Sequence, residues 1–405
     1  MMANSYKGTQ TDMNSVDSQL LQKAVEFQPL LKQKVDQIED SRQLPQSLAL
    51  DLAKAGFYRI CTPTGLGGLG SSPETFCRVC EILAEASGSA AWCVFIGATS
   101  QYMLPALDPS MCAEITSNPD VITSGVFAYS GTAIPATKDG ASGFWVNGRW
   151  DWGSGSLNAE WISGGVLIAD QNGERARSAD GNFIEARAFF QPGEINFLDN
   201  WHVSGLRGSG STSYTAENIF LPSKRVAMVE DLSLSEFASE QIYRYPKFGF
   251  LAIPIGAVCL GMARASIDEL IKIAKEKTPQ GSSRTMAHRS SLHKDVAIAD
   301  TNLSASKAFF YQTIRDTWAE VGTHESSLES RRALRTATFH AVTTAKDVTE
   351  RMYTIAGGTS IFDDSPLQRN FRDVHVAAQH MMVGEPVMEL AGRVMLGLDA
   401  IALGL

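Results

Sequence analysis

The chain has 405 residues, of which 44% are hydrophobic and 20% charged, and its formal net charge is −9. This length allows more than one domain with a sizeable core, and the composition is ordinary for a globular protein. A negative surface does not favour nucleic acid or anionic membranes, so we expect neither as a partner.

The sequence predicts a soluble cytoplasmic protein. Residues 1–18 are polar and contain no apolar run, which predicts no signal peptide. Two uncharged stretches, 86–107 and 248–263, are interrupted by polar residues, glycine or proline, so we expect buried helices rather than bilayer spans of about 20 residues. The six cysteines lie mostly in apolar sequence, as small core residues do in a reducing compartment.

The first third of the chain has helical spacing of apolar residues, from about residue 15 to 115. Residues 44–56 are predicted to form a helix that ends at a glycine, and 73–87 and 89–104 are two further helices. The glycine-rich run 65–70 between them is a helix–helix turn, since no strand precedes it as a dinucleotide fingerprint requires.

One of these helices contains Cys77 and Cys80, which have the spacing of a redox or zinc pair. No second cysteine pair follows at zinc spacing. We therefore interpret both cysteines as structural and predict no metal site.

The middle third reads as β structure, because its apolar segments are short and rich in aromatic and β-branched residues. Glycine, asparagine and aspartate separate the segments, and five of the seven tryptophans fall here. We expect a small antiparallel barrel or sandwich. The predicted strands are 121–129, 143–152, 161–168, 184–190 and 213–221.

The last part, from about residue 232, is helical again. Four long periodic segments, 263–277, 293–321, 330–356 and 373–398, are separated by proline or glycine, which favours an antiparallel four-helix bundle. The overall prediction is an α+β protein. Its domains are an N-terminal helical domain (1–118), a middle β domain (119–230) and a C-terminal helical bundle (231–405).

Three motifs carry chemical information. Residues 148–156 read Gly-Arg-Trp-Asp-Trp-Gly-Ser-Gly-Ser, where small residues let a planar ring approach the backbone and a serine hydroxyl can bond to it. Residues 201–212 contain Gly-Leu-Arg-Gly-Ser-Gly-Ser, whose glycines permit a sharp turn. The third is a Gly-Gly turn at 357–358, followed by Arg372-Asp373 and His380; histidine acts as acid or base near neutral pH.

Together these motifs resemble the acyl-CoA dehydrogenase fold: helices, a β domain and a helical bundle, over about residues 20–398. The dehydrogenases place a catalytic glutamate about eight residues after the Arg-Asp pair, where this chain has Gln379, His380 and Met381. The absent carboxylate makes the chain similar to the oxygen-using branch, the group D two-component flavin monooxygenases. Among these it most resembles the indole and indole-3-acetate monooxygenases.

The resemblance implies roles for single residues. Ser154 is expected beside the flavin N5 and C4a atoms, with Trp152, Gly153 and Gly155 along the ring; an ordinary surface β-turn is the alternative. His380 is expected to hydrogen-bond the C4a-hydroperoxide or to move a proton, although a lone helical histidine is usually structural. Positional matches to the flavin-pyrimidine loop are Phe127 and Thr132.

Further residues follow from the same resemblance. Arg284, Gly357 and Gly358 are expected to bind the cofactor's pyrophosphate or tail in a neighbouring subunit, which favours FAD over FMN and a homotetramer. A solvated arginine and a plain helix-ending turn are the alternatives. The substrate is expected against Ser100, Gln101 and Tyr102.

The implied activity is that of an oxygenase component. Reduced flavin from a separate NAD(P)H-dependent reductase reacts with O2, and one oxygen passes to an aromatic substrate. Ser100 stands where phenol-hydroxylating relatives carry a histidine, so we favour indole or an indole acid. Two alternatives stay open: an acyl-CoA dehydrogenase, with Glu385 as a candidate base, and a non-catalytic flavin-fold scaffold.

Overall fold

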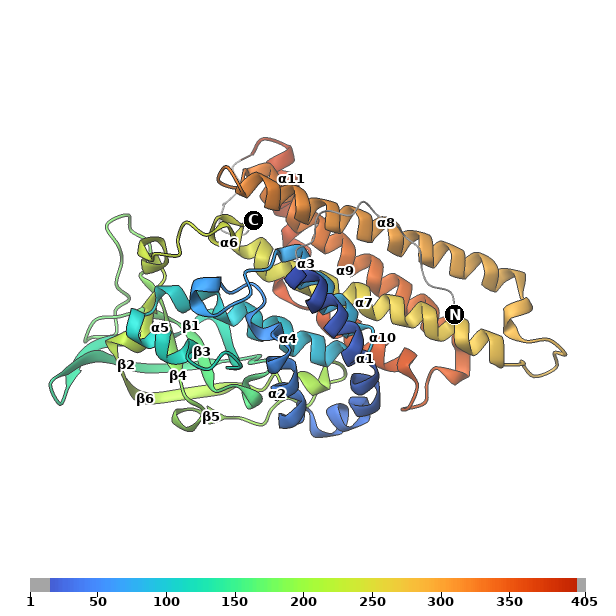
Figure 1. Ribbon diagram of the computed structural model, residues 1–405, viewed down its shortest axis with the longest axis horizontal. Helices are drawn as coiled ribbons and strands as arrows, with labels where there is room; N and C mark the ends of the chain where they lie inside the picture. Colours follow the sequence, from blue (N-terminus) through green and yellow to red (C-terminus); the bar gives the residue numbers. More distant parts are fainter. Residues whose placement is uncertain (1–14, 399–405) are drawn as a thin grey trace.

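The computed structural model describes residues 15–398, so most of the polar start of the chain lies outside the described residues. The chain folds into N-terminal helices, a β-sheet and a long helical bundle, with the sheet at one end of the long axis (Figure 1). The predicted order of N-terminal helices, β structure and C-terminal helical bundle is confirmed. The N-terminal helices are α1 (Ser15–Ser41), α2 (Gln46–Lys54), α3 (Pro73–Ala84), α4 (Gly88–Ser100) and α5 (Pro109–Thr116).

Local sequence signals set the ends of these helices. Ser72 and Ser87 cap α3 and α4, where each side chain accepts a backbone N–H at 3.2 Å. Pro73 occupies the first position of α3, where its missing N–H costs nothing. Gly56 follows α2 with a left-handed φ of 91°, as the predicted glycine stop requires.

The middle of the chain forms one seven-stranded sheet in the order β5-β6-β2-β1-β3-β4-β7. The pairs are antiparallel except β1 with β3, so the sheet is mixed rather than purely antiparallel. Two short strands, β5 and β7, were not predicted, because two or three residues carry no periodicity. The strands are β1 (Thr123–Lys138), β2 (Ala141–Trp150), β3 (Trp161–Ile168), β4 (Glu185–Phe190), β5 (Asn196–Phe197), β6 (Tyr214–Pro222) and β7 (Val226–Met228).

Trp150 forms the centre of the sheet's core. Its ring is fully buried, and its indole N–H donates to the Gly165 carbonyl at 2.8 Å. A Cβ atom built on Gly131, Gly148 or Gly164 would lie within 2.7 Å of this ring. Glycine at these three strand positions therefore makes the space that the indole fills.

The bundle contains α6 (Gln241–Arg244), α7 (Lys247–Glu276), α8 (Ser290–Val321), α9 (Leu328–Ala356), α10 (Pro366–Ala377) and α11 (Pro386–Met395). Helix α7 begins well before the predicted residue 263 and continues through Pro254. It is long and apolar enough to cross a membrane by composition, but 89% of its most apolar window is buried inside the protein, as in a core helix. Burial against α3 and α9 compensates for the missing proline hydrogen bond.

The predicted single helix over 373–398 is wrong. Helix α10 ends at Ala377, a short 3-10 helix covers Met381–Val383, and α11 starts at Pro386. Pro386 disfavours a helix through the residues just before it, and the His380 ring accepts the Met382 N–H at 3.2 Å, capping the short turn. His380 therefore lies in a turn between two helices, not on a helix face.

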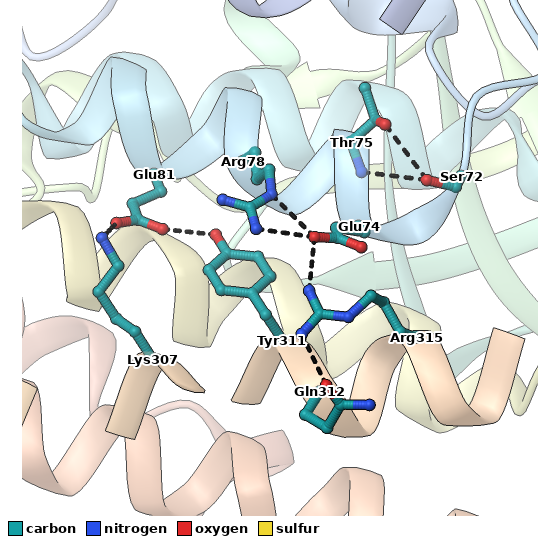
Figure 2. A network of polar contacts seen from close by, with 9 residues as sticks. All are labelled: Ser72, Glu74, Thr75, Arg78, Glu81, Lys307, Tyr311, Gln312 and Arg315. Carbon is teal, nitrogen blue, oxygen red and sulfur yellow. Dashed lines mark hydrogen bonds and ion pairs between the residues drawn. The ribbon is translucent and has the colours of Figure 1, made fainter. Parts of the chain in front are cut away.

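A polar network joins the N-terminal helices to the bundle (Figure 2). Glu81 on α3 forms an ion pair with Lys307 on α8 and accepts the Tyr311 hydroxyl at 2.5 Å. One turn away, Arg78 lies 4.3 Å from the centre of the Tyr311 ring. Arg78 and Arg315 both donate hydrogen bonds to Glu74. The network fixes α3 against α8, and through α3 it holds the start of α4.

Candidate active site

Five side chains form the serine–tryptophan cluster, which lies between α4 and the sheet. Its members are Trp92, Ser124, Ser154, Ser209 and Ser211. The Trp92 indole N–H donates to Ser154 Oγ at 3.1 Å, and Ser154 Oγ lies 2.6 Å from Ser211 Oγ. A hydroxyl offers one donor and two acceptor positions, so one position on Ser154 has no protein partner.

The turn that presents Ser154 has an unusual backbone. Trp152 has a φ of 62° and a side chain that is 73% exposed, which is uncommon for so large an apolar residue. A Cβ on Gly153 would lie 2.7 Å from the Tyr214 ring, so no larger residue fits there. The N–H groups of Gly153 and Gly155 bond to the carbonyls of Thr212 and Ser209, which hold this conformation in place.

The Gly-Leu-Arg-Gly turn connects this region to α10. The Leu206 N–H donates to Asp373 Oδ1 at 2.6 Å, and Leu206 itself has a φ of 50°. A Cβ on Gly205 would lie 2.3 Å from the Arg372 carbonyl, so the turn lies directly against the helix. Burial raises the pKa of Asp373, and the nearby Glu39 adds to the rise. Asp373 lies on α10, the helix that precedes His380. Its hydrogen bond therefore fixes the turn that leads to Ser209 and Ser211 relative to that helix.

His380 lies next to the serine–tryptophan cluster. Its ring centre is 6.0 Å from that of Trp92, in an edge-on arrangement. Because Nδ1 accepts the Met382 N–H, the neutral ring carries its proton on Nε2. Burial, assisted by the positive charge of Arg335, lowers the pKa of His380 to about 4. At neutral pH the imidazole is therefore an uncharged hydrogen-bond donor.

Arg335 on α9 is the charged residue that acts on the pKa of His380. It is 3% exposed, and its guanidinium donates to the Phe248 carbonyl at 3.2 Å and lies 3.6 Å from the Met382 sulfur. Burial lowers the pKa of Arg335 to about 10. The turn that carries His380 thus lies over a buried cation.

The structure brings only some of the predicted cofactor residues together. Gly153, Ser154 and Gly155 are adjacent to His380 through Trp92. Phe127 lies under the Arg187 guanidinium, at 3.7 Å from its ring centre. Among residues 15–398, no hydrogen bond or ring contact joins Thr132 to the serine–tryptophan cluster.

Arg284, Gly357 and Gly358 lie elsewhere in the chain. All three are exposed, and Arg284 belongs to the connection between α7 and α8, at the end of the bundle opposite the sheet (Figure 1). Lys277 Nζ, at the end of α7, donates to the Ala356 carbonyl at 3.0 Å and to Thr359 Oγ1 at 2.5 Å. These predicted tail contacts therefore share one end of the bundle, away from Ser154.

The predicted substrate residues are buried at the end of α4. Ser100 Oγ donates to the Ile96 carbonyl at 2.7 Å, and Gln101 Oε1 accepts from Thr62 at 2.5 Å. The Tyr102 ring lies 5.6 Å from that of Phe250. Gln101 and Tyr102 line a cavity with room for about one water molecule, whereas Ser100 does not line it.

Several residues of the site were missed at the sequence level. Ser211 stood inside the recognised motif at 201–212 and Trp92 inside the predicted helix 89–104, but their contacts to Ser154 depend on the tertiary fold. Arg335 gave no signal, since it is one of several arginines on a predicted helix. Only the helix packing shows that it is buried.

Comparisons with known proteins agree with this fold. The family model for the acyl-CoA dehydrogenase N-terminal domain matches residues 18–108, and the model for the acyl-CoA dehydrogenase C-terminal domain matches residues 253–385. Indole-3-acetate monooxygenase of Pseudomonas putida is 31% identical over 352 residues, covering 86% of each chain. Flavin-dependent monooxygenase oxygenase subunit HsaA of Rhodococcus jostii is 26% identical, covering 87% of this chain and 91% of the relative.

A solved structure gives the same fold. XiaF from Streptomyces, in complex with FADH2 and glycerol, has a TM-score of 0.85 at 22% identity, covering 96% of this chain and 99% of that chain. Fold and site together define a flavoprotein of the acyl-CoA dehydrogenase type. The chain belongs to the acyl-CoA dehydrogenase family, and within it to the flavin-dependent monooxygenases. It is an enzyme, the oxygenase component that needs reduced flavin from a separate reductase.

The residues present fit a flavin. Ser154 keeps one hydrogen-bonding position without a partner among the described residues, and the exposed Trp152 ring offers an apolar surface. A planar ring with an N–H at its centre needs an acceptor for that N–H and an apolar surface for its face.

Proposed function

We propose that this enzyme oxygenates indole or an indole acid in the cytoplasm, using O2 and reduced FAD from an NAD(P)H-dependent reductase. The relationship to the Pseudomonas putida indole-3-acetate monooxygenase supports this substrate class. The observation that carries the chemistry is the neutral imidazole of His380, with its proton on Nε2, beside Trp92 and Ser154.

Each residue of the site has one task. Reduced flavin supplies the activation of oxygen. Ser154 accepts a hydrogen bond from the flavin ring through its free hydroxyl position, and Trp92 holds the serine at the required angle. His380 donates its Nε2–H, or moves a proton, at the place where oxygen transfer leaves negative charge. Buried apolar neighbours exclude water.

The positions of the acidic residues argue against dehydrogenase chemistry, which needs a carboxylate base. Glu385 is exposed at the start of α11. Asp373 is buried, but its carboxylate accepts the Leu206 N–H and fixes the turn there. In the described part of the chain, neither carboxylate has a hydrogen bond to the serine–tryptophan cluster or to His380.

We further propose FAD rather than FMN, and a homotetramer. Arg284 lies in the exposed connection between α7 and α8, at the end of the bundle opposite the sheet (Figure 1), and the exposed Gly357 and Gly358 follow α9, whose last residue bonds to Lys277 beyond the end of α7. A guanidinium and unobstructed peptide N–H groups suit a pyrophosphate. If a neighbouring subunit contributes this group to each flavin, the adenine half is bound only in the assembly.

The test supplies chemically reduced FAD, O2 and a panel of aromatics to the purified protein. An oxygenated product from indole or an indole acid is expected, and reduced FMN should support less of it. Product from phenols alone would reject the substrate class. Reduction of bound flavin by acyl-CoA, with no reductase present, would instead indicate the dehydrogenase.

A further inference from the structure

Arg335 has a feature that the oxygenation chemistry does not use. The residue is 3% exposed, yet among the described residues its guanidinium bonds to one carbonyl oxygen and one thioether sulfur. Nε is buried without a partner among the described residues, as it also is in Arg187, Arg225 and Arg369, so the missing counter-ion is what sets Arg335 apart. Within residues 15–398 no carboxylate forms an ion pair with Arg335. A buried cation without an anion is costly, and proteins normally pair it.

Other buried arginines of this chain show the usual solution. Arg369 is 9% exposed and pairs with Asp36 at 3.1 Å, and the partly buried Arg225 pairs with Glu194. Arg187 lacks an ion pair but lies 3.7 Å over the Phe127 ring, whose face attracts a cation. Among the residues that the structure describes, neither a carboxylate nor an aromatic ring contacts the Arg335 guanidinium.

We propose that Arg335 binds the carboxylate of the substrate and so selects aromatic acids over neutral aromatics. This inference rests on the proposed function and names the charge of its substrate. A guanidinium forms paired, charge-assisted hydrogen bonds to a carboxylate, and the unpartnered Nε is part of that donor fork.

The location of Arg335 suits this role. Met382 contacts Arg335 through its sulfur and His380 through its backbone N–H, so a single turn joins the cation to the catalytic imidazole. Phe248, the other residue that contacts Arg335, lies in the first turn of helix α7. An acid held at Arg335 would extend its ring toward His380 and Trp92.

Electrostatic coupling supplies a second, independent consequence. The positive charge of Arg335 helps to keep the pKa of His380 low. A bound carboxylate neutralises that charge, so the pKa of His380 rises when an acid binds. A neutral ligand of the same shape leaves it unchanged.

The experiment measures binding rather than turnover. Indole-3-acetate and indole-3-acetamide differ in charge but barely in shape, and their affinities for the FAD-bound protein are compared by calorimetry. We expect the acid to bind about 10- to 100-fold more tightly. Equal affinity would overturn the inference, whereas a failure to oxygenate any aromatic would overturn the proposed function and leave this comparison intact.

Variants localise the effect. Arg335→Met should remove the preference for the acid while the amide still binds, and Arg335→Lys should restore part of it. Arg351→Met is the matched control, because Arg351 lies on the same helix, about 24 Å further along at 1.5 Å per residue, and pairs with Asp295. If the control lost the preference equally, or Arg335→Met kept it, the assignment would be wrong.

If Arg335→Met does not fold, the wild-type protein still decides. The pKa of His380, followed by NMR, should rise with indole-3-acetate and stay fixed with the acetamide. No difference between the two ligands would contradict the proposal.

Discussion

Two buried charged residues, Glu81 and Arg335, are treated in opposite ways by this fold. Glu81 is 4% exposed, and it pairs with Lys307 and accepts the Tyr311 hydroxyl within the network that joins α3 to α8 (Figure 2). Arg335 is equally buried, but it is held by a carbonyl and a sulfur. The cost of burying the charge is therefore compensated by protein partners at Glu81, whereas Arg335 has no counter-ion among the described residues.

The difference separates structure from function. A charge that is fully paired inside the protein has nothing left to offer a ligand, and it serves to fix two elements against each other. A charge that lacks its counter-ion is a site where a ligand can supply what is missing. The same reasoning applies to Ser154, whose hydroxyl keeps one position without a protein partner.

The largest expected effect concerns His380, the histidine next to the Arg335 cation. His380→Ala removes the neutral donor beside Trp92, and product formation should fall by about 10²- to 10⁴-fold, the usual contribution of a general acid or base. Single-turnover product yield with reduced FAD measures this, and FAD affinity should hold.

A second histidine provides the control for this change. His375 binds the Phe371 carbonyl at 2.7 Å and stacks on the Phe371 ring within α10. His375→Ala should leave the yield within a few-fold. If His380→Ala behaves like His375→Ala, the imidazole has no catalytic role.

The next prediction tests how much the paired charge of Glu81 contributes to stability. Glu81→Ala leaves the Lys307 ammonium and the buried Tyr311 hydroxyl without their partner, so we expect the free energy of unfolding to fall by about 3 kcal/mol. Urea unfolding measures it. Asp295→Ala breaks only the more exposed pair with Arg351 and should cost less than about 1 kcal/mol. Equal losses would show that burial of Glu81 adds nothing.

The sequence predicted the fold well wherever one element alone determines the pattern. The helix ending at Gly56 and the strand 161–168 follow from local periodicity and were confirmed. The break at His380 was not predicted, because the helical apolar spacing continues through it and a ring-to-backbone hydrogen bond decides the outcome. The parallel pairing of β1 with β3 likewise depends on connections that periodicity does not encode.

The candidate site was predictable only as motifs. Ser154 and His380 came from the resemblance to a family, and the structure shows them joined through Trp92. The roles of Arg284 and Gly358 stay predictions, since a partner subunit is needed to test them. Arg335 became visible only through packing, because a buried and a solvated arginine look alike in a sequence.

A smaller effect is expected at the free position on Ser154. Ser154→Ala removes the hydroxyl that holds the Trp92 indole and the proposed flavin contact, so we expect about a 10-fold faster loss of reduced flavin without product formation. Peroxide release per turnover measures this loss. Ser124→Ala is the matched control, because Ser124 Oγ bonds only to the backbone carbonyl of residue 154, at 2.7 Å. Equal peroxide release in both variants would assign the effect to packing.

The last expected effect concerns pH, and it links both sides of the comparison. The pKa of His380 is about 4 in the folded protein, against an ordinary value near 6.5 in the unfolded chain. Between these values the unfolded chain binds the proton and the folded protein does not, so stability from this group is complete above pH 6.5 and is lost as the pH falls toward 4. His380→Asn retains an acceptor for the Met382 N–H but does not titrate. Its free energy of unfolding, measured in urea at pH 7 and 4.5, should therefore fall less than that of the wild type, and equal falls would mean that burial and the charge of Arg335 do not keep His380 neutral.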